Sequence, residues 1–142
     1  MKLLKIKISD AEVANQAGEY KNFTGIIDWK GSKGQVKNAD FELQANGDIW
    51  WHNGYWVKGI WNRGEWQKGW WENGTWKNGS WLNGKWQNGT WKNGDFNYGT
   101  WYDGVWENGD WFGFPEKWKK GTWKNGRIEG KPSKVSPREF EG

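Results

Sequence analysis

Large aromatic residues recur every five positions along most of this chain. Over residues 54–113 each five-residue unit begins with Gly, carries an aromatic residue at its third position and often ends with Asn. Gly84-Lys85-Trp86-Gln87-Asn88 is typical, and the third residue is Trp in nearly every unit. A short fixed period indicates that each unit is one structural element, which can bury its large residue only against neighbouring units.

The same phase extends beyond the obvious repeats. Towards the N-terminus it includes residues 34–38, with Val36 at the centre, and residues 39–43, with Phe41 at the centre. Only residues 44–48 lack an apolar central residue. After Gly113 the register shifts by two residues, and it resumes at Gly121. We therefore expect a repeat array over residues 34–130, with a register slip at 114–120, and a C-terminal tail at 131–142.

The first residues follow a different pattern. Residues 3–8 alternate between apolar and charged side chains, which is typical of a half-buried strand. Residues 18–22 and 25–29 contain units that are out of phase with the array. Because terminal units of a repeat array must present a finished surface, residues 1–33 are predicted to form an N-terminal β cap.

A period of five fits neither a long helix nor a long strand, and two folds accommodate it. In a β-solenoid each unit forms one short side of a coil, with its third residue and its small first residue pointing inward. In an antiparallel meander, three-residue strands are joined by Asn-Gly turns, a strong hairpin signal. A meander leaves a whole aromatic face uncovered. We therefore expect an all-β fold, a short β-solenoid, with the meander as the alternative.

Ala39-Asp40-Phe41-Glu42-Leu43 resembles the A-(D/N)-(L/F)-x-x unit of the pentapeptide-repeat family. This resemblance implies a right-handed quadrilateral β-helix with about four units per coil. Most units differ from the family pattern, with Trp in place of Leu or Phe and Gly in place of Ala. The WKNG strings at 76–79, 91–94 and 123–126 are similar to MORN repeats, which are antiparallel and support the meander. Runs of G-x-(W/F)-x-N units are similar to phage-encoded and large-virus proteins, which implies a location in a virion or in host cytoplasm.

The amino-acid composition indicates which residues form the core and which kinds of partner the chain could bind. The chain has 142 residues with 17 Trp and no Cys, so the core must be aromatic and no disulfide can form. No apolar run approaches the roughly 20 residues of a membrane-spanning helix, and the N-terminus lacks the apolar core of a signal peptide. The excess of positive charge lies in residues 113–142, so the basic residues between 117 and 138 are a candidate nucleic-acid contact. They are Lys117, Lys119, Lys120, Lys124, Arg127, Lys131, Lys134 and Arg138.

The residue types that carry catalysis are sparse. His52 is the single histidine, and the carboxylates are scattered among unit positions that elsewhere hold Lys, Thr or Gln. No Gly is followed by Lys-Ser or Lys-Thr at the spacing of a phosphate-binding loop. We expect no catalytic, cofactor-binding or metal-binding residues and no small-molecule substrate, and we expect that the protein is not an enzyme.

Aromatic residues outside the third position should face solvent. Trp50, Tyr55 and Trp70 form the candidate interaction surface: with four units per coil, Trp50 and Trp70 would stack on one outer face, with Tyr55 around the corner. Exposed aromatic patches are typical of protein contacts. We expect a non-enzymatic structural or interaction protein with a protein partner or self-association, and a component of a larger assembly such as a phage particle. The alternative is a binding module for glycan or nucleic acid that uses these aromatics or the basic C-terminal end.

Overall fold

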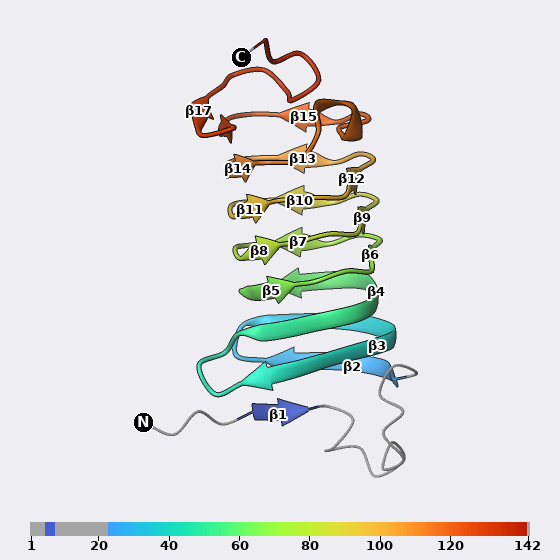
Figure 1. Cartoon of the computed structure of the whole chain (residues 1–142). Helices are drawn as coiled ribbons and strands as arrows, with labels where there is room; N and C mark the ends of the chain where they lie inside the picture. Colours follow the sequence, from blue (N-terminus) through green and yellow to red (C-terminus); the bar gives the residue numbers. More distant parts are fainter. Residues whose placement is uncertain (1–4, 8–22, 142) are drawn as a thin grey trace.

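The computed structural model describes residues 5–7 and 23–141, which form an all-β solenoid of about 5 turns (Figure 1). Strands of successive turns pair in parallel, and the paired residues are fifteen positions apart in the regular part of the array, as in Trp66 and Trp81 or Trp76 and Trp91. Each turn therefore contains three five-residue units and has three sides.

We name the sides A, B and C by their strands. Side A comprises β5 (Gly64–Trp66), β8 (Ser80–Trp81), β11 (Asp95–Phe96), β14 (Asp110–Trp111) and β16 (Arg127–Ile128). Side B comprises β6 (Trp70–Trp71), β9 (Lys85–Trp86) and β12 (Thr100–Trp101). Side C comprises β7 (Thr75–Trp76), β10 (Thr90–Trp91), β13 (Val105–Trp106) and β15 (Thr122–Trp123). The first turn is one bent strand, β4 (Ile49–Trp61), which pairs with β5, β6 and β7 in succession.

The solenoid is confirmed, but the expected four units per coil are wrong. The coil has three units and is triangular rather than quadrilateral, and a Gly with positive φ lies at the corners between regular units. Three inward indole rings then meet within one turn, as in Trp71 and Trp76, whose ring centroids are 5.9 Å apart at an interplanar angle of 75°. The meander alternative is also wrong, because the strands of adjacent turns run parallel.

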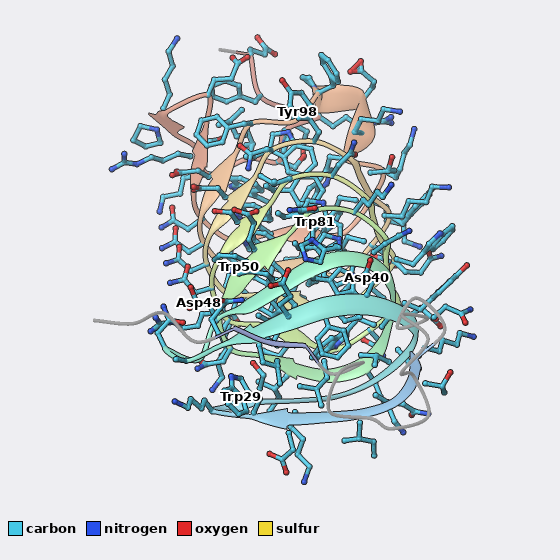
Figure 2. The ribbon with its side chains drawn as sticks, turned by 60° about the horizontal axis from the view of Figure 1, so that its bottom comes forward. Trp29, Asp40, Asp48, Trp50, Trp81 and Tyr98 are labelled. Atoms are coloured by element: carbon cyan, nitrogen blue, oxygen red, sulfur yellow. The ribbon has the colours of Figure 1, made fainter. Side chains whose placement is uncertain are left out.

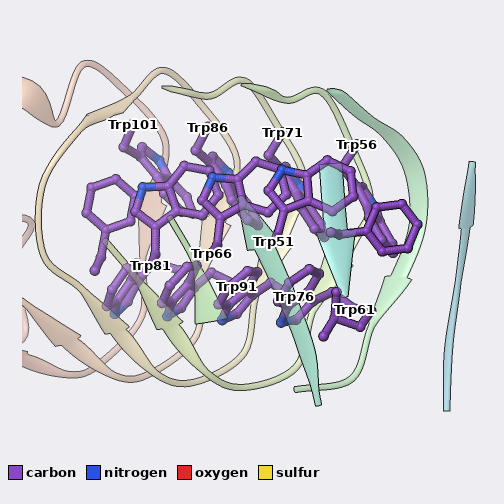
Figure 3. Packing of buried hydrophobic residues seen from close by; sticks show 14 of the residues in the cluster. Trp51, Trp56, Trp61, Trp66, Trp71, Trp76, Trp81, Trp86, Trp91 and Trp101 are labelled. Atoms are coloured by element: carbon purple, nitrogen blue, oxygen red, sulfur yellow. The ribbon is translucent and has the colours of Figure 1, made fainter. Parts of the chain in front are cut away.

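The third-position rings fill the interior and form three stacked columns (Figure 3). In the side-B column, Trp86 lies 4.8 Å from Trp71 and 4.8 Å from Trp101, centroid to centroid, with interplanar angles of 5° and 6°. Within a turn the rings meet edge to face, as Trp86 does with Trp91 at 5.6 Å and 72°. Both arrangements are favoured by the quadrupole of an aromatic ring. The third-position side chains from Trp51 to Trp111 are all fully buried.

The Gly that opens each unit does not point into the core, as the sequence suggested, but forms the corner of the coil. Gly84 has a φ of +125°, and a Cβ at this position would lie 2.5 Å from the carbonyl oxygen of Gly69 in the preceding turn. The preceding Asn83 supports the corner, because its Oδ1 accepts a hydrogen bond from the backbone N–H of Gly84 at 2.8 Å. Asn-Gly is therefore a corner motif here rather than a hairpin turn.

An antiparallel cap closes the N-terminal end. β3 (Ser32–Gln44) runs antiparallel to β4, and both β2 (Phe23–Trp29) and β1 (Lys5–Lys7) pair antiparallel with β3. Residues 34–44, which we expected in the array, thus belong to this cap. Their inward side chains still follow the five-residue phase, and Phe41 stacks on Trp51 at 5.3 Å. The chain reverses within residues 44–48, the one unit without an apolar centre, where the N–H of Gly47 bonds to the carbonyl of Gln44.

The C-terminal tail covers the other end of the core. β17 (Lys131–Pro132) turns back antiparallel to β16, and the indole Nε1 of Trp123 donates to the carbonyl of Ser133 at 3.0 Å. Phe140 packs against the buried cluster. The register slip is absorbed by a short 3-10 helix at Pro115–Lys117, so that Trp118 still aligns with Trp101. Across the described residues, no helix is long and apolar enough to cross a membrane. Residues 1–4 and 8–22 of the expected N-terminal cap lie outside the described part.

Truncation of a central ring should destabilise the solenoid strongly. Trp86→Ala removes a ring that contacts both neighbouring turns, and we expect the free energy of unfolding to fall by about 3–5 kcal/mol. Gln87→Ala, the next and exposed residue, should change it by less than about 0.5 kcal/mol. Urea denaturation followed by far-UV circular dichroism measures both. Equal losses at the two positions would contradict the inward assignment of Trp86.

A methyl group at a corner should also be costly. Gly84→Ala combines a positive φ with a clash against Gly69, and we expect a loss of about 2–3 kcal/mol. Gly130 also has a positive φ, +77°, but a Cβ there would meet nothing within 4 Å. Gly130→Ala should therefore lose only about 1 kcal/mol from backbone strain. The same denaturation experiment compares them, and a cost at Gly84 no greater than that at Gly130 would exclude the proposed clash.

Candidate interaction surface

The rings fill the solenoid core, so the hollows in the described residues lie on its outside. They occur at corners, where Gly provides no side chain, and each is lined by outward residues of three successive turns. Among the described residues, no group of three or more His, Cys, Asp or Glu side chains could hold a metal ion. What the fold offers a partner is therefore its outer surface.

The structure separates the three predicted surface residues. Trp50 aligns with Glu65 on side A, whereas Tyr55 aligns with Trp70 on side B. The expected stacking of Trp50 on Trp70 is wrong, because twenty residues are one turn and one further side of a fifteen-residue coil. Trp50 lines a hollow at the corner between sides C and A together with Asp48, near the N-terminal turns (Figure 2). Whether any of the three contacts a partner stays a prediction.

Tyr55 and Trp70 instead form a column with two lysines. The two rings stack with centroids 6.2 Å apart and an interplanar angle of 11°. The Nζ of Lys37 lies 5.3 Å from the centroid of Tyr55, and the Nζ of Lys85 lies 4.5 Å from the centroid of Trp70. Cation–π contacts of this kind contribute about 0.5–1 kcal/mol at exposed sites. Each ring has the other ring on one face and a lysine on the other face. This column is therefore better suited to stabilising the solenoid than to stacking on a ligand.

More exposed apolar side chains gather on side A and at its corner with side B. We name Leu82, Tyr98, Phe112 and Phe114 the side-A apolar cluster; their exposed fractions are 37%, 57%, 46% and 58%. Leu82 and Phe112 follow the inward residues of β8 and β14 and point outward. Tyr98 and Phe114 lie at the corner, with ring centroids 6.3 Å apart. Figure 2 shows Tyr98 near the C-terminal turns.

Phe114 was not predicted as a surface residue, because it lies in the register slip, where the five-residue phase assigns no inward or outward position. The two extra residues of the slip are accommodated at Pro115–Lys117, and the residue before them is displaced outward beside Tyr98, one turn earlier. The signal was the aromatic pair Phe112 and Phe114, which flanks the last Gly of the regular phase. An interruption of a regular array that exposes a large ring is a feature that packing alone does not explain.

The corner between sides A and B is basic as well as aromatic. A hollow of about 350 Å³ lies there, and Tyr98 and Phe114 line it together with Lys85 and Lys117. Lys68 occupies the equivalent corner position two turns before Tyr98 and is exposed. Side chains with a positive charge therefore flank the side-A apolar cluster along one edge.

The opposite edge of side A is acidic. Glu65, Asp95 and Asp110 occupy one column, with Ser80 between the first two and Arg127 after the last, because their strands pair in register. Burial raises the pKa of Asp95 above its ordinary value, and the charge and the side chain of the adjacent Asp110 raise this pKa further. Two carboxylates directly above one another are an unfavourable pair on a parallel ladder.

The basic C-terminal residues do not form one face. Lys117 lies at the corner of sides A and B, Lys119 on side B, Lys124 on side C and Arg127 on side A, because successive units occupy successive sides. Neutralising a polyanion requires several cations on one surface. The distribution around the coil therefore gives little support to a nucleic-acid contact by this segment.

The single histidine has a structural environment. His52 Nε2 lies 2.7 Å from a carboxylate oxygen of Glu42 in the cap, and Nδ1 lies 3.2 Å from the side-chain oxygen of Gln67 in the second turn. His52 thus connects the N-terminal cap to the first two turns of the solenoid.

Neutralising Asp95 should stabilise the protein increasingly as pH rises. The raised pKa means that folded Asp95 binds its proton more tightly than unfolded Asp95, whose pKa is about 3.8. Its contribution to stability is therefore present at low pH and is lost as pH rises through the folded pKa. We expect Asp95→Asn to gain stability over the wild type between about pH 4 and pH 7. Urea denaturation at several pH values measures this difference.

Asp103→Asn is the matched control. Asp103 Oδ2 lies 3.6 Å from Lys120 Nζ, which carries the opposite charge. Removing the carboxylate of Asp103 should therefore give no gain in stability as pH rises. A gain of the same size in both variants, or none in Asp95→Asn, would show that the Asp95–Asp110 pair has no energetic effect.

Comparison of the chain with protein-family models, with curated proteins and with solved structures finds no match.

Proposed function

We propose that this protein is a non-enzymatic structural or interaction protein and a component of a larger assembly. The observation that carries the proposal is the concentration of exposed apolar side chains on side A and its basic corner. Of the aromatic rings that the structure describes, only Tyr98, Phe112 and Phe114 are exposed, and all three belong to this surface. A protein contact uses a central apolar patch with a charged rim. The side-A apolar cluster between the acidic column and the lysines has this composition.

The solenoid core supports a structural role. Each turn repeats the same backbone hydrogen bonds, such as those from the N–H groups of Lys85 and Gln87 to the carbonyls of Gly69 and Trp71. The three ring columns stack through these turns without a break. A rod of this kind presents outward side chains at fixed spacing and requires no ligand-binding interior. The binding of glycan or nucleic acid, the alternative from the sequence, has less support because the Tyr55–Trp70 column is covered and the C-terminal cations are dispersed.

Replacing the three exposed rings of the side-A apolar cluster should release the protein from its assembly. In the variant Tyr98→Ser/Phe112→Ser/Phe114→Ser, all changed side chains are exposed, so folding should persist while association falls at least tenfold. The measurement is the fraction of tagged protein that co-sediments with high-mass complexes from its native source, beside circular dichroism of the purified variant.

Two exposed apolar residues elsewhere provide the control. Ile60 and Val135 are exposed to 40% and 42% but lie outside side A. The variant Ile60→Ser/Val135→Ser should co-sediment as the wild type does. Undiminished co-sedimentation of the folded side-A variant would refute the proposed interaction role of this surface.

A further inference from the structure

The outward columns of side A form a surface with an internal order of charge. Its edge at the corner with side C carries Glu65, Asp95 and Asp110, with Arg127 in the last turn, and its middle carries Leu82 and Phe112. The opposite edge, at the corner with side B, carries the rings of Tyr98 and Phe114 beside lysines. Across its width, the surface is acidic, then apolar, then basic. When a second copy turns the same surface towards the first, its order is reversed, so that acidic side chains face basic ones and the apolar middles meet.

We propose that side A binds a second copy of this chain, and that the two solenoids lie side by side and parallel, related by a two-fold axis along the solenoid direction. This proposal rests on the proposed function and names the partner of the same surface. A closed two-fold pair is the commonest symmetry of soluble oligomers, and its interface uses the same patch on both copies.

Charge complementarity selects the parallel arrangement. Rotation about an axis along the solenoid places the acidic edge of one copy against the basic edge of the other, turn against equal turn. Rotation about an axis across side A would instead place acidic edge against acidic edge, and like charges in an interface are strongly unfavourable. The same repeat on both copies keeps the contacts in register over the length of side A.

The positions of the charged residues along the solenoid axis agree with this arrangement. Glu65 and Lys68 belong to the same unit, and Asp110 and Lys117 belong to the same turn. In the parallel pair, Glu65 of one copy therefore faces Lys68 of the other, and Asp110 faces Lys117. The second contact adds a cation near Asp110, whose in-register neighbour in the next turn is Arg127.

The size of side A sets the expected strength of the pair. Five strands about 4.8 Å apart and a side of five residues at about 3.3 Å each cover roughly 24 Å by 16 Å, on the order of 400 Å² of each copy. An interface of about 800 Å² in total lies below the standard size for stable complexes. We therefore expect a dissociation constant in the micromolar range, and a dimer at about 100 μM protein by sedimentation equilibrium.

Charge reversal tests which columns meet. Asp110→Lys alone and Lys117→Asp alone each place like charges opposite one another, so each variant should be monomeric at a concentration where the wild type is a dimer. An equimolar mixture of the two variants restores both opposite-charge contacts of the symmetric pair and should dimerise again. Lys124→Asp, a lysine of the same turn on side C, should dimerise as the wild type does.

Single cysteines test the direction of the two copies. The chain contains no Cys, so an introduced thiol can form a disulfide only with its counterpart. Gln67 and Asn97 lie two turns apart in the middle of side A, and in the parallel pair each faces itself. Gln67→Cys and Asn97→Cys should both form disulfide dimers under mild oxidation, since the Cα atoms need approach only to about 6 Å. Gln87→Cys, on side B, should not.

The outcomes separate this proposal from the proposed function. A wild type that stays monomeric at about 100 μM, a mixture that fails to dimerise, or a disulfide at only one of the two positions would each overturn the parallel pair. If the side-A serine variant nevertheless leaves its assembly, the surface binds a different partner and only the pairing is wrong. If that variant stays in its assembly while the wild type is monomeric, both proposals fail.

Discussion

Stacking of buried indole rings at the spacing of parallel strands is the interaction on which the rest of the structure depends. The centroids of Trp66 and Trp81 are 4.7 Å apart, and those of Trp76 and Trp91 are 4.8 Å apart, which matches the distance between hydrogen-bonded strands. Each added turn therefore satisfies its backbone hydrogen bonds and its ring contacts together. In a chain with only 35% hydrophobic residues, these rings supply most of the buried apolar area.

The glycine corners follow from the same packing. Three large rings fill the cross-section of one turn, so the coil must close after three short sides, and the chain must turn sharply between them. Gly84 permits this turn through its positive φ, and it also leaves room for the ring of the preceding turn, because a Cβ there would lie 3.1 Å from Trp66 Nε1. The indole edge reaches towards the next corner. Trp76 Nε1 donates to the carbonyl of Asn93 at 3.1 Å, whereas the Nε1 atoms of Trp66 and Trp86 have no hydrogen-bond partner among the described residues. The ring and the corner are thus one packing unit.

A coil of fifteen residues also organises the surface. Residues fifteen apart lie above one another, so a small bias in composition becomes a column, as with Glu65, Asp95 and Asp110. The same rule brings Tyr55 onto Trp70 and separates Trp50 from both. The only departure from the rule within the array, at Pro115–Lys117, displaces Phe114 onto the surface. The candidate interaction surface is therefore a product of the coil length and of its single interruption.

The sequence by itself determined the unit and its inward residue. A five-residue period with Trp at its third position predicts an all-β array with buried rings, since a meander could not cover them, and a solenoid with buried rings is what forms. Only the tertiary structure decided how many units close a turn. This number depends on how three rings pack across the interior and on the backbone angle at Gly, and neither produces a repeating pattern in the sequence. That number in turn decides which outward residues become neighbours. The side-A apolar cluster could therefore not be predicted from spacing alone, and neither could the reversal of β3, where the five-residue phase continues but the chain runs the other way.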